Sequence, residues 1–426
     1  MRGGKIIGEG VDGCVFIGDA VPCRDGSNLG INSKNDRYVK KIVKTTDKEP
    51  VYLKIASVLL GPEYASKYIT ALHGECKPAN IKNPPSRKNR NEFISSRKNI
   101  LSWTPRGMAC GDLKDRIIRD ESLSENYKVL YVSRYAMDII RWCKLNVEEH
   151  IPYKTVVKQL EHAIPTFIQV LQKLYQGKTA QLIHVDLHSG NMFVRLNPLE
   201  LGIADFGRCV FRRYGGSEER SAVSFYGEYL IGHLSRQYLY TGYRQIPLEV
   251  RLLNYCYHRK LELAHPVDLI TIWEHDPDVT QTAAGSKDII VLNRGIMLKY
   301  LLTKPLFIAM IETLQSISRK LRANPTDPIK LVQSMNQTDK MVMEFLLTRY
   351  SIISPINSIT EEFMNAYPTE PMLLPSGVGS NALIRYVIYA ILLPYDHASM
   401  SLATRLKAVQ DSDMGQLWSS VASPAF

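Results

Sequence analysis

Short stretches of β-forming residues, separated by glycine-rich turns, dominate the first part of the chain. Residues 5–17 place two such stretches around a glycine-dense turn, which predicts a β-hairpin. Residues 38–43 and 129–135 have the same strand character, and residues 49–60 repeat apolar side chains at helical spacing. The pattern therefore predicts a small antiparallel sheet with one main helix.

Helical periodicity prevails in the rest of the chain. Apolar positions mark one face of a long helix at residues 155–176, in which Pro165 is expected to introduce a kink. Beyond about residue 220, apolar helical segments alternate with Pro, Gly and Asn breaks. Together the two patterns predict an α+β fold in which a β-rich part precedes a large, mainly helical part.

The composition is that of a globular protein with an excess of positive charge. Hydrophobic residues make up 45% and charged residues 22% of the 426 residues, which supplies ample apolar material for a core. The net charge of +11 favours acidic partners such as nucleotides, nucleic acid, anionic membranes or acidic protein segments. The sequence contains no signature of a nucleic-acid-binding module, and its most apolar runs are too short to cross a membrane. Residues 77–99 are polar and basic, which predicts an exposed insertion.

Seven cysteines are scattered along the chain, and no two of them form a Cys-x-x-Cys pair. Their odd number and wide spacing predict reduced thiols and an intracellular setting. The first residues run directly into a strand pattern, without the apolar segment of a secretion signal. We therefore expect the protein to act in the cytoplasm.

A glycine-rich stretch lies in the first predicted hairpin. Gly8, Gly10 and Gly13 follow the pattern Gly-x-Gly-x-x-Gly-x-Val, which includes Glu9 and Val15. Residues without a Cβ allow backbone N–H groups to approach phosphate oxygens closely. The same glycine spacing opens a helix in a dinucleotide-binding turn. Here a strand follows instead, which favours a loop that covers the phosphates of ATP.

Two lysines and two glutamates could complete such a phosphate site. A strand lysine is needed to hold the α- and β-phosphates, and a carboxylate from a neighbouring helix is needed to aim it. Lys41 and Glu49 are the candidates. Lys40 competes with Lys41, but the two-residue strand period favours Lys41 if Val39 faces the cleft. Glu63 competes with Glu49, and a solvated surface pair is a further alternative.

Two polar motifs follow apolar strands later in the chain. The first, His-x-Asp-Leu-x-x-x-Asn, spans residues 184–191. In it, Asp186 could accept the proton of an attacking hydroxyl and Asn191 could ligate a metal ion, while His184 is expected to support the loop. The second, Asp-Phe-Gly, begins fourteen residues after Asn191, and its Asp205 offers a hard oxygen ligand for Mg²⁺. The order and distance of the two motifs favour one catalytic site.

Together, the glycine-rich stretch, the strand lysine and these two motifs resemble the protein kinase superfamily over roughly residues 5–210. The wording His-x-Asp-Leu-His-x-Gly-Asn looks most like the serine/threonine kinases of large DNA viruses, of the poxvirus and iridovirus types. The resemblance implies a bilobal fold with an N-lobe at residues 1–138 and a helical C-lobe at residues 139–426. It implies transfer of phosphate from ATP, with Mg²⁺ or Mn²⁺, to Ser or Thr hydroxyls of proteins. It also implies that residues 135–138 contact adenine. It also implies action in infected-cell cytoplasm and packaging in virions.

The motifs depart from those of ordinary cellular kinases in three places. Val185 replaces the arginine that clasps a phosphorylated activation segment, so control by that phosphorylation is not expected. His188 stands where serine/threonine kinases carry lysine, and the wording around it also resembles aminoglycoside and choline kinases. A small-molecule kinase is therefore one alternative, and a pseudokinase or virion scaffold is another. Residues 246–249, Ile-Pro-Leu-Glu, are a distant substitute for the Ala-Pro-Glu of the family.

A cluster of arginines follows Asp205, namely Arg208, Arg212, Arg213 and Arg220. Their charge could favour acidic or already phosphorylated protein substrates. A solvated basic loop is the alternative.

Overall fold

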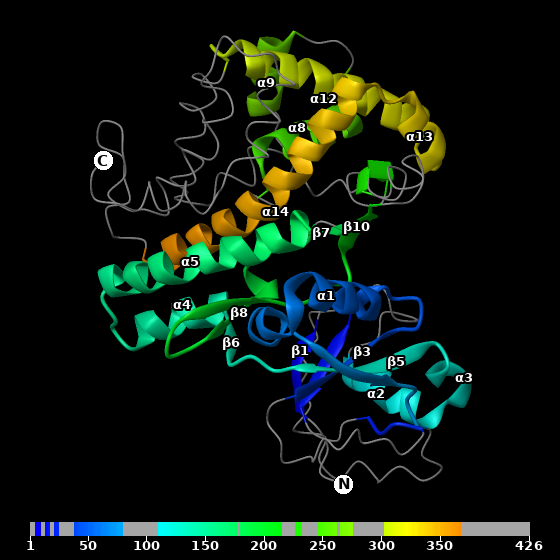
Figure 1. Ribbon diagram of the computed structural model, residues 1–426, viewed down its shortest axis with the longest axis vertical. Helices are drawn as coiled ribbons and strands as arrows, with labels where there is room; N and C mark the ends of the chain where they lie inside the picture. Colours follow the sequence, from blue (N-terminus) through cyan, green and yellow to red (C-terminus); the bar gives the residue numbers. More distant parts are fainter. Residues whose placement is uncertain are drawn as a thin grey trace. The chain divides into compact units, whose positions relative to one another are not determined.

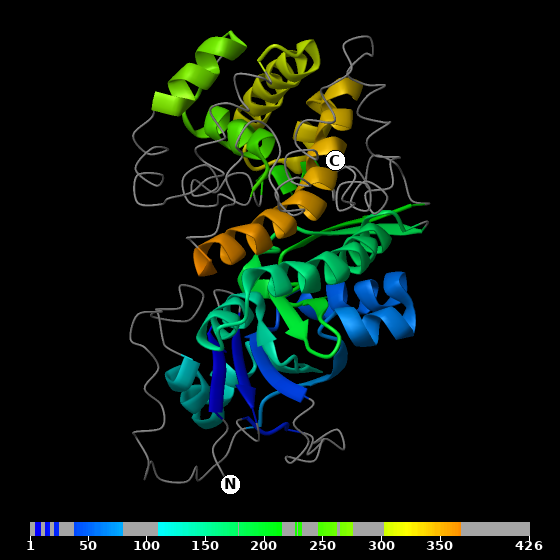
Figure 2. The same ribbon diagram turned by 90° about the vertical axis from the view of Figure 1, so that its left-hand side faces the viewer.

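The computed structural model describes eleven stretches of the chain (Figures 1 and 2). They are residues 5–9 (backbone), 13–17, 21–24, 38–79, 110–177, 179–214, 226–227, 229–231, 246–261, 265–275 and 302–367. Gly10, Arg220 and most of the predicted basic insertion lie outside them. The fold is mixed α+β, with small antiparallel sheets and several helices, as the sequence predicts.

The chain divides into two compact units. The first comprises residues 1–136 and 202–208, and the second comprises residues 137–201 and 209–426. The predicted boundary at residue 138 places residues 202–208 in the helical part. They belong to the first unit because Thr70 N–H donates to the Ile203 carbonyl at 3.0 Å and Lys41 pairs with Asp205.

The first unit is built on a five-stranded sheet with the strand order β1-β2-β3-β5-β4. The strands are β1 (Lys5–Glu9), β2 (Cys14–Ile17), β3 (Tyr38–Lys44), β4 (Leu72–Cys76) and β5 (Tyr127–Ser133), and neighbours pair antiparallel. The predicted hairpin at residues 5–17 and the predicted strand at residues 38–43 are thereby confirmed.

The helices of the first unit are α1 (Glu49–Tyr68), α2 (Cys110–Arg119) and α3 (Glu121–Ser124). At the start of α1, the Asp47 carboxylate accepts from the Glu49 N–H at 2.7 Å, which satisfies one of the open donors of a helix N-terminus. The helix passes beyond the predicted end at residue 60. Gly61 has a φ of 77° and precedes Pro62, so the helix kinks there and then continues to Tyr68.

Two disulfide bonds lie in the core of the first unit. Cys14 of β2 is bonded to Cys110 of α2, and Cys23 is bonded to Cys76 of β4. The prediction of reduced thiols is wrong for these four cysteines. Their pairs are 96 and 53 residues apart in sequence, and the fold alone brings their Cα atoms to 5.6 and 5.7 Å. The remaining cysteines, Cys143, Cys209 and Cys256, are buried thiols of the second unit.

The second unit is mainly helical. Its helices include α4 (Ile139–Glu148), α5 (Tyr153–Tyr175), α8 (Leu248–His258), α9 (Pro266–His275), α12 (Pro305–Ala323), α13 (Pro328–Ser334) and α14 (Gln337–Ala366). The predicted helix at residues 155–176 is confirmed as α5, which continues through Pro165. Strand β7 (Ala180–His184) pairs antiparallel with β10 (Cys209–Arg213), and β6 (Met137–Asp138) pairs with β8 (Met192–Arg195). Strand β9 (Glu200–Ile203) carries the chain from the second unit into the first.

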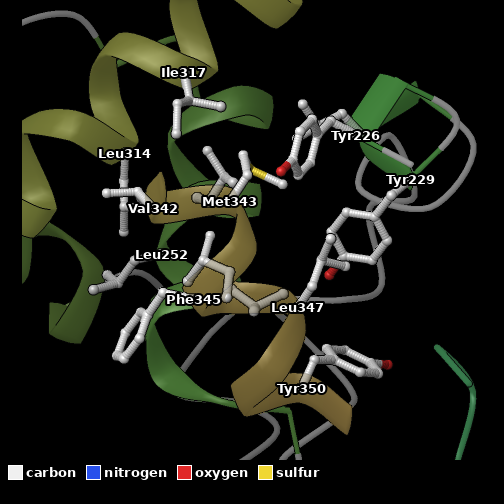
Figure 3. Close-up of a cluster of buried hydrophobic side chains, with 14 of the residues drawn as sticks. Tyr226, Tyr229, Leu252, Leu314, Ile317, Val342, Met343, Phe345, Leu347 and Tyr350 are labelled. Carbon is white, nitrogen blue, oxygen red and sulfur yellow. The ribbon is translucent and has the colours of Figure 1, made fainter. Parts of the chain in front are cut away.

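Helix α14 lies at the centre of the second unit's core. It starts with a capping box, in which Asn336 and Asp339 each accept from the other's backbone N–H at 2.8 Å. Its apolar side chains point in several directions, towards Tyr226 and Tyr229 on one side and towards residues of α8 and α12 on the other (Figure 3). Helix α5 lies beside it (Figures 1 and 2). A helix buried on so many faces is held by packing all round.

Candidate functional site

The first unit brings together Lys41, Glu49 and Asp205, three of the predicted site residues. Lys41 lies in the middle of β3, and 6% of it is exposed. Its Nζ is 2.8 Å from Glu49 Oε2 and 2.7 Å from Asp205 Oδ1. These contacts join residues that are up to 164 positions apart in sequence. The arrangement is a buried ammonium held between two carboxylates.

The alternative lysine and the alternative glutamate lie elsewhere. Lys40, the neighbour of Lys41, points to the opposite face of the sheet. Its Nζ donates to the Val21 carbonyl at 3.2 Å and lies 5.3 Å from the centre of the Tyr131 ring. Glu63 is exposed and follows the kink in α1, whereas 1% of Glu49 is exposed in the first turn. The solvated surface pair is thereby contradicted, because Lys41 and Glu49 form a buried pair.

Burial and neighbouring charges shift the pKa values of both Lys41 and Glu49. Burial alone would lower the pKa of Lys41, but Asp205 and Glu49 outweigh it and raise the pKa, so the ammonium stays charged. Burial raises the pKa of Glu49 to about 7, because it outweighs the Lys41 ammonium, which lowers the pKa, and the negative charge of Asp205 adds to the rise. One cation thus faces two carboxylates. Asp205 is the more exposed of the two carboxylates, because 25% of its side chain is accessible.

Asp205 has an unusual backbone conformation. It follows β9 with a φ of 60°, in the left-handed region that a non-glycine residue rarely adopts. Such a conformation costs about 1–3 kcal/mol and often occurs at functional sites. The next residue, Phe206, is fully buried. The carboxylate is thus held at the end of the strand by a strained turn and a buried anchor.

The described part of the glycine-rich stretch lies next to Lys41. Val15 on β2 is directly opposite both Gly8 on β1 and Lys41 on β3, so these residues share one face of the sheet. A Cβ on Gly13 would lie 2.7 Å from Lys41 Cε and 3.0 Å from the Ile42 carbonyl oxygen. Only glycine leaves room there for the lysine. Glu9 is the last residue of β1.

The second unit holds Asp186 and Asn191, in the loop that joins β7 to β8. The Asn191 Nδ2 donates to the Asp186 carbonyl at 2.8 Å, so the amide oxygen of Asn191 is the atom that could ligate a metal. The buried His184 accepts the Asp186 N–H at its Nδ1, at 3.3 Å. His184 therefore supports the loop, as predicted.

His188 also has a structural contact. It precedes the short 3₁₀ helix η2 (Ser189–Asn191), and its Nδ1 accepts from the Gly190 N–H at 3.1 Å. Val185, which stands in place of the family's arginine, is buried in the apolar core of the second unit. Both departures from the kinase motif thus have a local structural role.

Several contacts of the second unit were not predicted from the sequence. Glu249, at the end of the Ile-Pro-Leu-Glu segment, forms a buried ion pair with Arg349 of α14 at 3.1 Å. Arg212 pairs with Glu344 at 3.1 Å, and Tyr226 donates to the same carboxylate at 2.6 Å. A solvated loop is therefore the wrong description of Arg212. No sequence signal indicates these pairs, because their partners are about 100 or more residues apart.

The predicted adenine-contacting segment, residues 135–138, is where the chain passes from the first unit to the second. Tyr135 is buried, and its hydroxyl donates to the Lys67 carbonyl at 2.8 Å. Asp138 caps α4 by accepting from the Arg141 N–H at 2.7 Å. Neither contact involves the backbone groups that would bind adenine, so that role stays a prediction.

Comparison of the sequence with protein-family models and with curated proteins found no significant match. The kinase resemblance and its viral subtype therefore stay predictions. Within the described ranges, no group of three or more His, Cys, Asp or Glu side chains could hold a metal ion by itself. Nor is any helix of those ranges long and apolar enough to cross a membrane.

Proposed function

We propose that the protein is an ATP-dependent phosphotransferase that phosphorylates Ser or Thr hydroxyls of proteins, with Mg²⁺ or Mn²⁺ as cofactor. The observation that carries the proposal is the Lys41 ammonium, held within 2.8 Å of both Glu49 and Asp205 beside Gly13. A buried lysine aimed by two carboxylates is suited to binding phosphate oxygens. Gly8, Glu9, Gly10, Gly13 and Val15 would cover the phosphates.

Asp186 is the proposed catalytic base. It would accept the proton of the attacking hydroxyl, and its backbone is fixed by His184 and by the Asn191 side chain. The imidazole of His188, which suggested a small-molecule kinase, is engaged by Gly190. That contact explains the histidine by loop geometry, and we therefore favour a protein acceptor.

The proposal includes a divalent metal ion. The Asp205 side chain is 25% exposed, and carboxylate and amide oxygens are the ligands that Mg²⁺ prefers. Asp205 and Asn191 are the proposed metal ligands, each through a side-chain oxygen. When bound, the metal would neutralise charge on the phosphates.

The proposal is tested by transfer of labelled phosphate from ATP to mixed protein substrates in the presence of Mg²⁺ or Mn²⁺. Asp186→Asn should lower kcat by at least about 10²-fold, because it removes the base. Asp205→Ala should abolish metal-dependent transfer. A matched control is the lysine pair, since Lys41→Met should be inactive and Lys40→Met should keep activity.

Three results would contradict the proposal. Equal labelling by wild type and Asp186→Asn would remove Asp186 from its role. ATP binding without transfer, across metals and substrates, would support the pseudokinase alternative. Phosphoamino-acid analysis decides the acceptor, because label that appears only on small molecules would exclude a protein kinase.

A further inference from the structure

Ser189 ties the loop between Asp186 and Asn191 to helix α14. It is the first residue of η2, and 6% of it is exposed. Its backbone N–H donates to Ser358 Oγ at 2.8 Å, and its own Oγ donates to Glu362 Oε1 at 2.9 Å. Two hydrogen bonds from one residue to one helix fix both its position and its direction.

The two partners are placed for this contact by helical geometry. Ser358 and Glu362 are four residues apart on α14, so they lie one above the other on the same face. The first N–H of a helix has no partner within the helix, and leaving it buried and unsatisfied costs about 1–3 kcal/mol. Ser358, itself 4% exposed, supplies that partner from outside the loop.

Hydrogen bonds within the loop connect Ser189 and its neighbours to Asp186 and Asn191. Asn191 Nδ2 reaches the Asp186 carbonyl, and the Asn191 N–H reaches the His188 carbonyl at 2.8 Å. Ser189 is three residues from Asp186 and two from Asn191. A shift of Ser189 would therefore move the proposed base and the proposed metal ligand together.

We infer that Ser358 and Glu362 are positioning residues that set the orientation of Asp186 and Asn191 through Ser189. The inference rests on the proposed function, and it adds residues that lie 169 and 173 positions after Ser189 in sequence. Glu362 acts as a hydrogen-bond acceptor for Ser189. A glutamine keeps an acceptor oxygen and lacks the charge, so it separates the two properties.

The test compares Glu362→Ala, Glu362→Gln and Ser189→Ala in the full-length chain. Asn365→Ala is the matched control, because Asn365 lies exposed on the same helix. For each variant, kcat, KM for ATP, affinity for a fluorescent ATP analogue and the melting temperature are measured. Glu362→Ala should lower kcat about 10–100-fold, the usual effect of a misplaced catalytic group. The analogue's affinity without added metal should stay within about twofold of the wild type, since Lys41 lies outside this loop, and KM for ATP should change less than kcat.

Glu362→Gln should keep most of the wild-type kcat. Ser189→Ala should lower kcat as Glu362→Ala does, and it provides the test if Glu362→Ala proves too unstable to study. Unchanged kcat in both Glu362→Ala and Ser189→Ala, with an active wild type, would overturn this inference alone. A Glu362→Gln variant as slow as Glu362→Ala would also overturn it, because charge would then be the cause. No transfer by the wild type would overturn the proposed function and this inference with it.

Discussion

Lys41 shows how a single side chain depends on its neighbours' size and charge. Gly13 leaves the space that its stem occupies, and Glu49 and Asp205 hold its ammonium. Glu49 faces Lys41 and is buried, and burial is the main cause that raises the pKa of Glu49. The negative charges of Asp205 and Asp47 raise this pKa further. With a pKa of about 7, Glu49 gains a proton near neutral pH.

This proton should be visible in the pH dependence of activity. Below about pH 7, Glu49 becomes neutral and Lys41 pairs more closely with Asp205, away from the phosphates. We expect kcat/KM for ATP to fall on the acid side with an apparent pKa near 7. Glu49→Gln cannot ionise, so it should lower kcat/KM by up to about 10²-fold at high pH and remove this acid limb. The measurement is the rate profile of both proteins from about pH 5.5 to 9.

The matched control is Glu63→Gln, on the exposed part of α1 beyond the kink. It should keep both the rate and the acid limb. An acid limb that persists in Glu49→Gln would assign the proton to another group.

At the scale of elements, the sequence predicts those helices and strands that depend on interactions between residues close in sequence. The hairpin of β1 and β2, strand β3 and helix α5 follow from side-chain periodicity within each segment. The Asp186 and Asn191 loop follows from a fixed spacing over a few residues. The extension of α1 beyond Gly61 was missed, because a Gly-Pro pair usually ends a helix and only tertiary packing continues it.

Contacts over long sequence distances could not be predicted in the same way. Ser358 and Glu362 are ordinary polar residues in the sequence, and nothing near them indicates that they reach Ser189. The same holds for the two disulfides and for the pair of Glu249 and Arg349. Each contact depends on which elements the fold brings together, and the spacing of side chains along the sequence does not indicate which elements these are.

The ion pair between Glu249 and Arg349 joins α8 to α14, and both side chains are at most 3% exposed. Arg349→Met would leave the Glu249 carboxylate buried without its cation. We expect the free energy of unfolding to fall by about 3–5 kcal/mol. The double variant Glu249→Leu/Arg349→Met should recover most of the loss, because two apolar side chains of similar size can replace a buried pair. Chemical denaturation of the wild type, both single variants and the double variant gives the coupling energy, and additive effects would show that the pair does not interact.

At the scale of the whole molecule, the two units are stabilised by different means. The first unit has a five-stranded sheet, three helices among its described residues, and both disulfides, Cys14–Cys110 and Cys23–Cys76. The second unit has a large apolar core around α14, and its cysteines are thiols. Disulfides contribute most where a core is small, because they reduce the entropy of the unfolded chain.

Reduction of the disulfides should therefore affect the units unequally. Each bond contributes about 2–4 kcal/mol, so a reductant should lower the stability of the first unit and leave the second nearly unchanged. Hydrogen exchange followed by mass spectrometry, with and without reductant, is the measurement. Peptides from β3, α1 and β5 should lose protection, and peptides from α5 and α14 should keep it. ATP affinity should fall in parallel, because Lys41 and Glu49 belong to the first unit.

The double variant Cys23→Ser/Cys76→Ser separates the bond from other effects of the reductant. Without reductant it should already show part of the exchange seen in the reduced wild type. Added reductant should then cause only the further change that belongs to Cys14–Cys110. Loss of protection in α14 equal to that in β3 would mean that the two units unfold as one cooperative structure, and that the disulfides support the molecule as a whole.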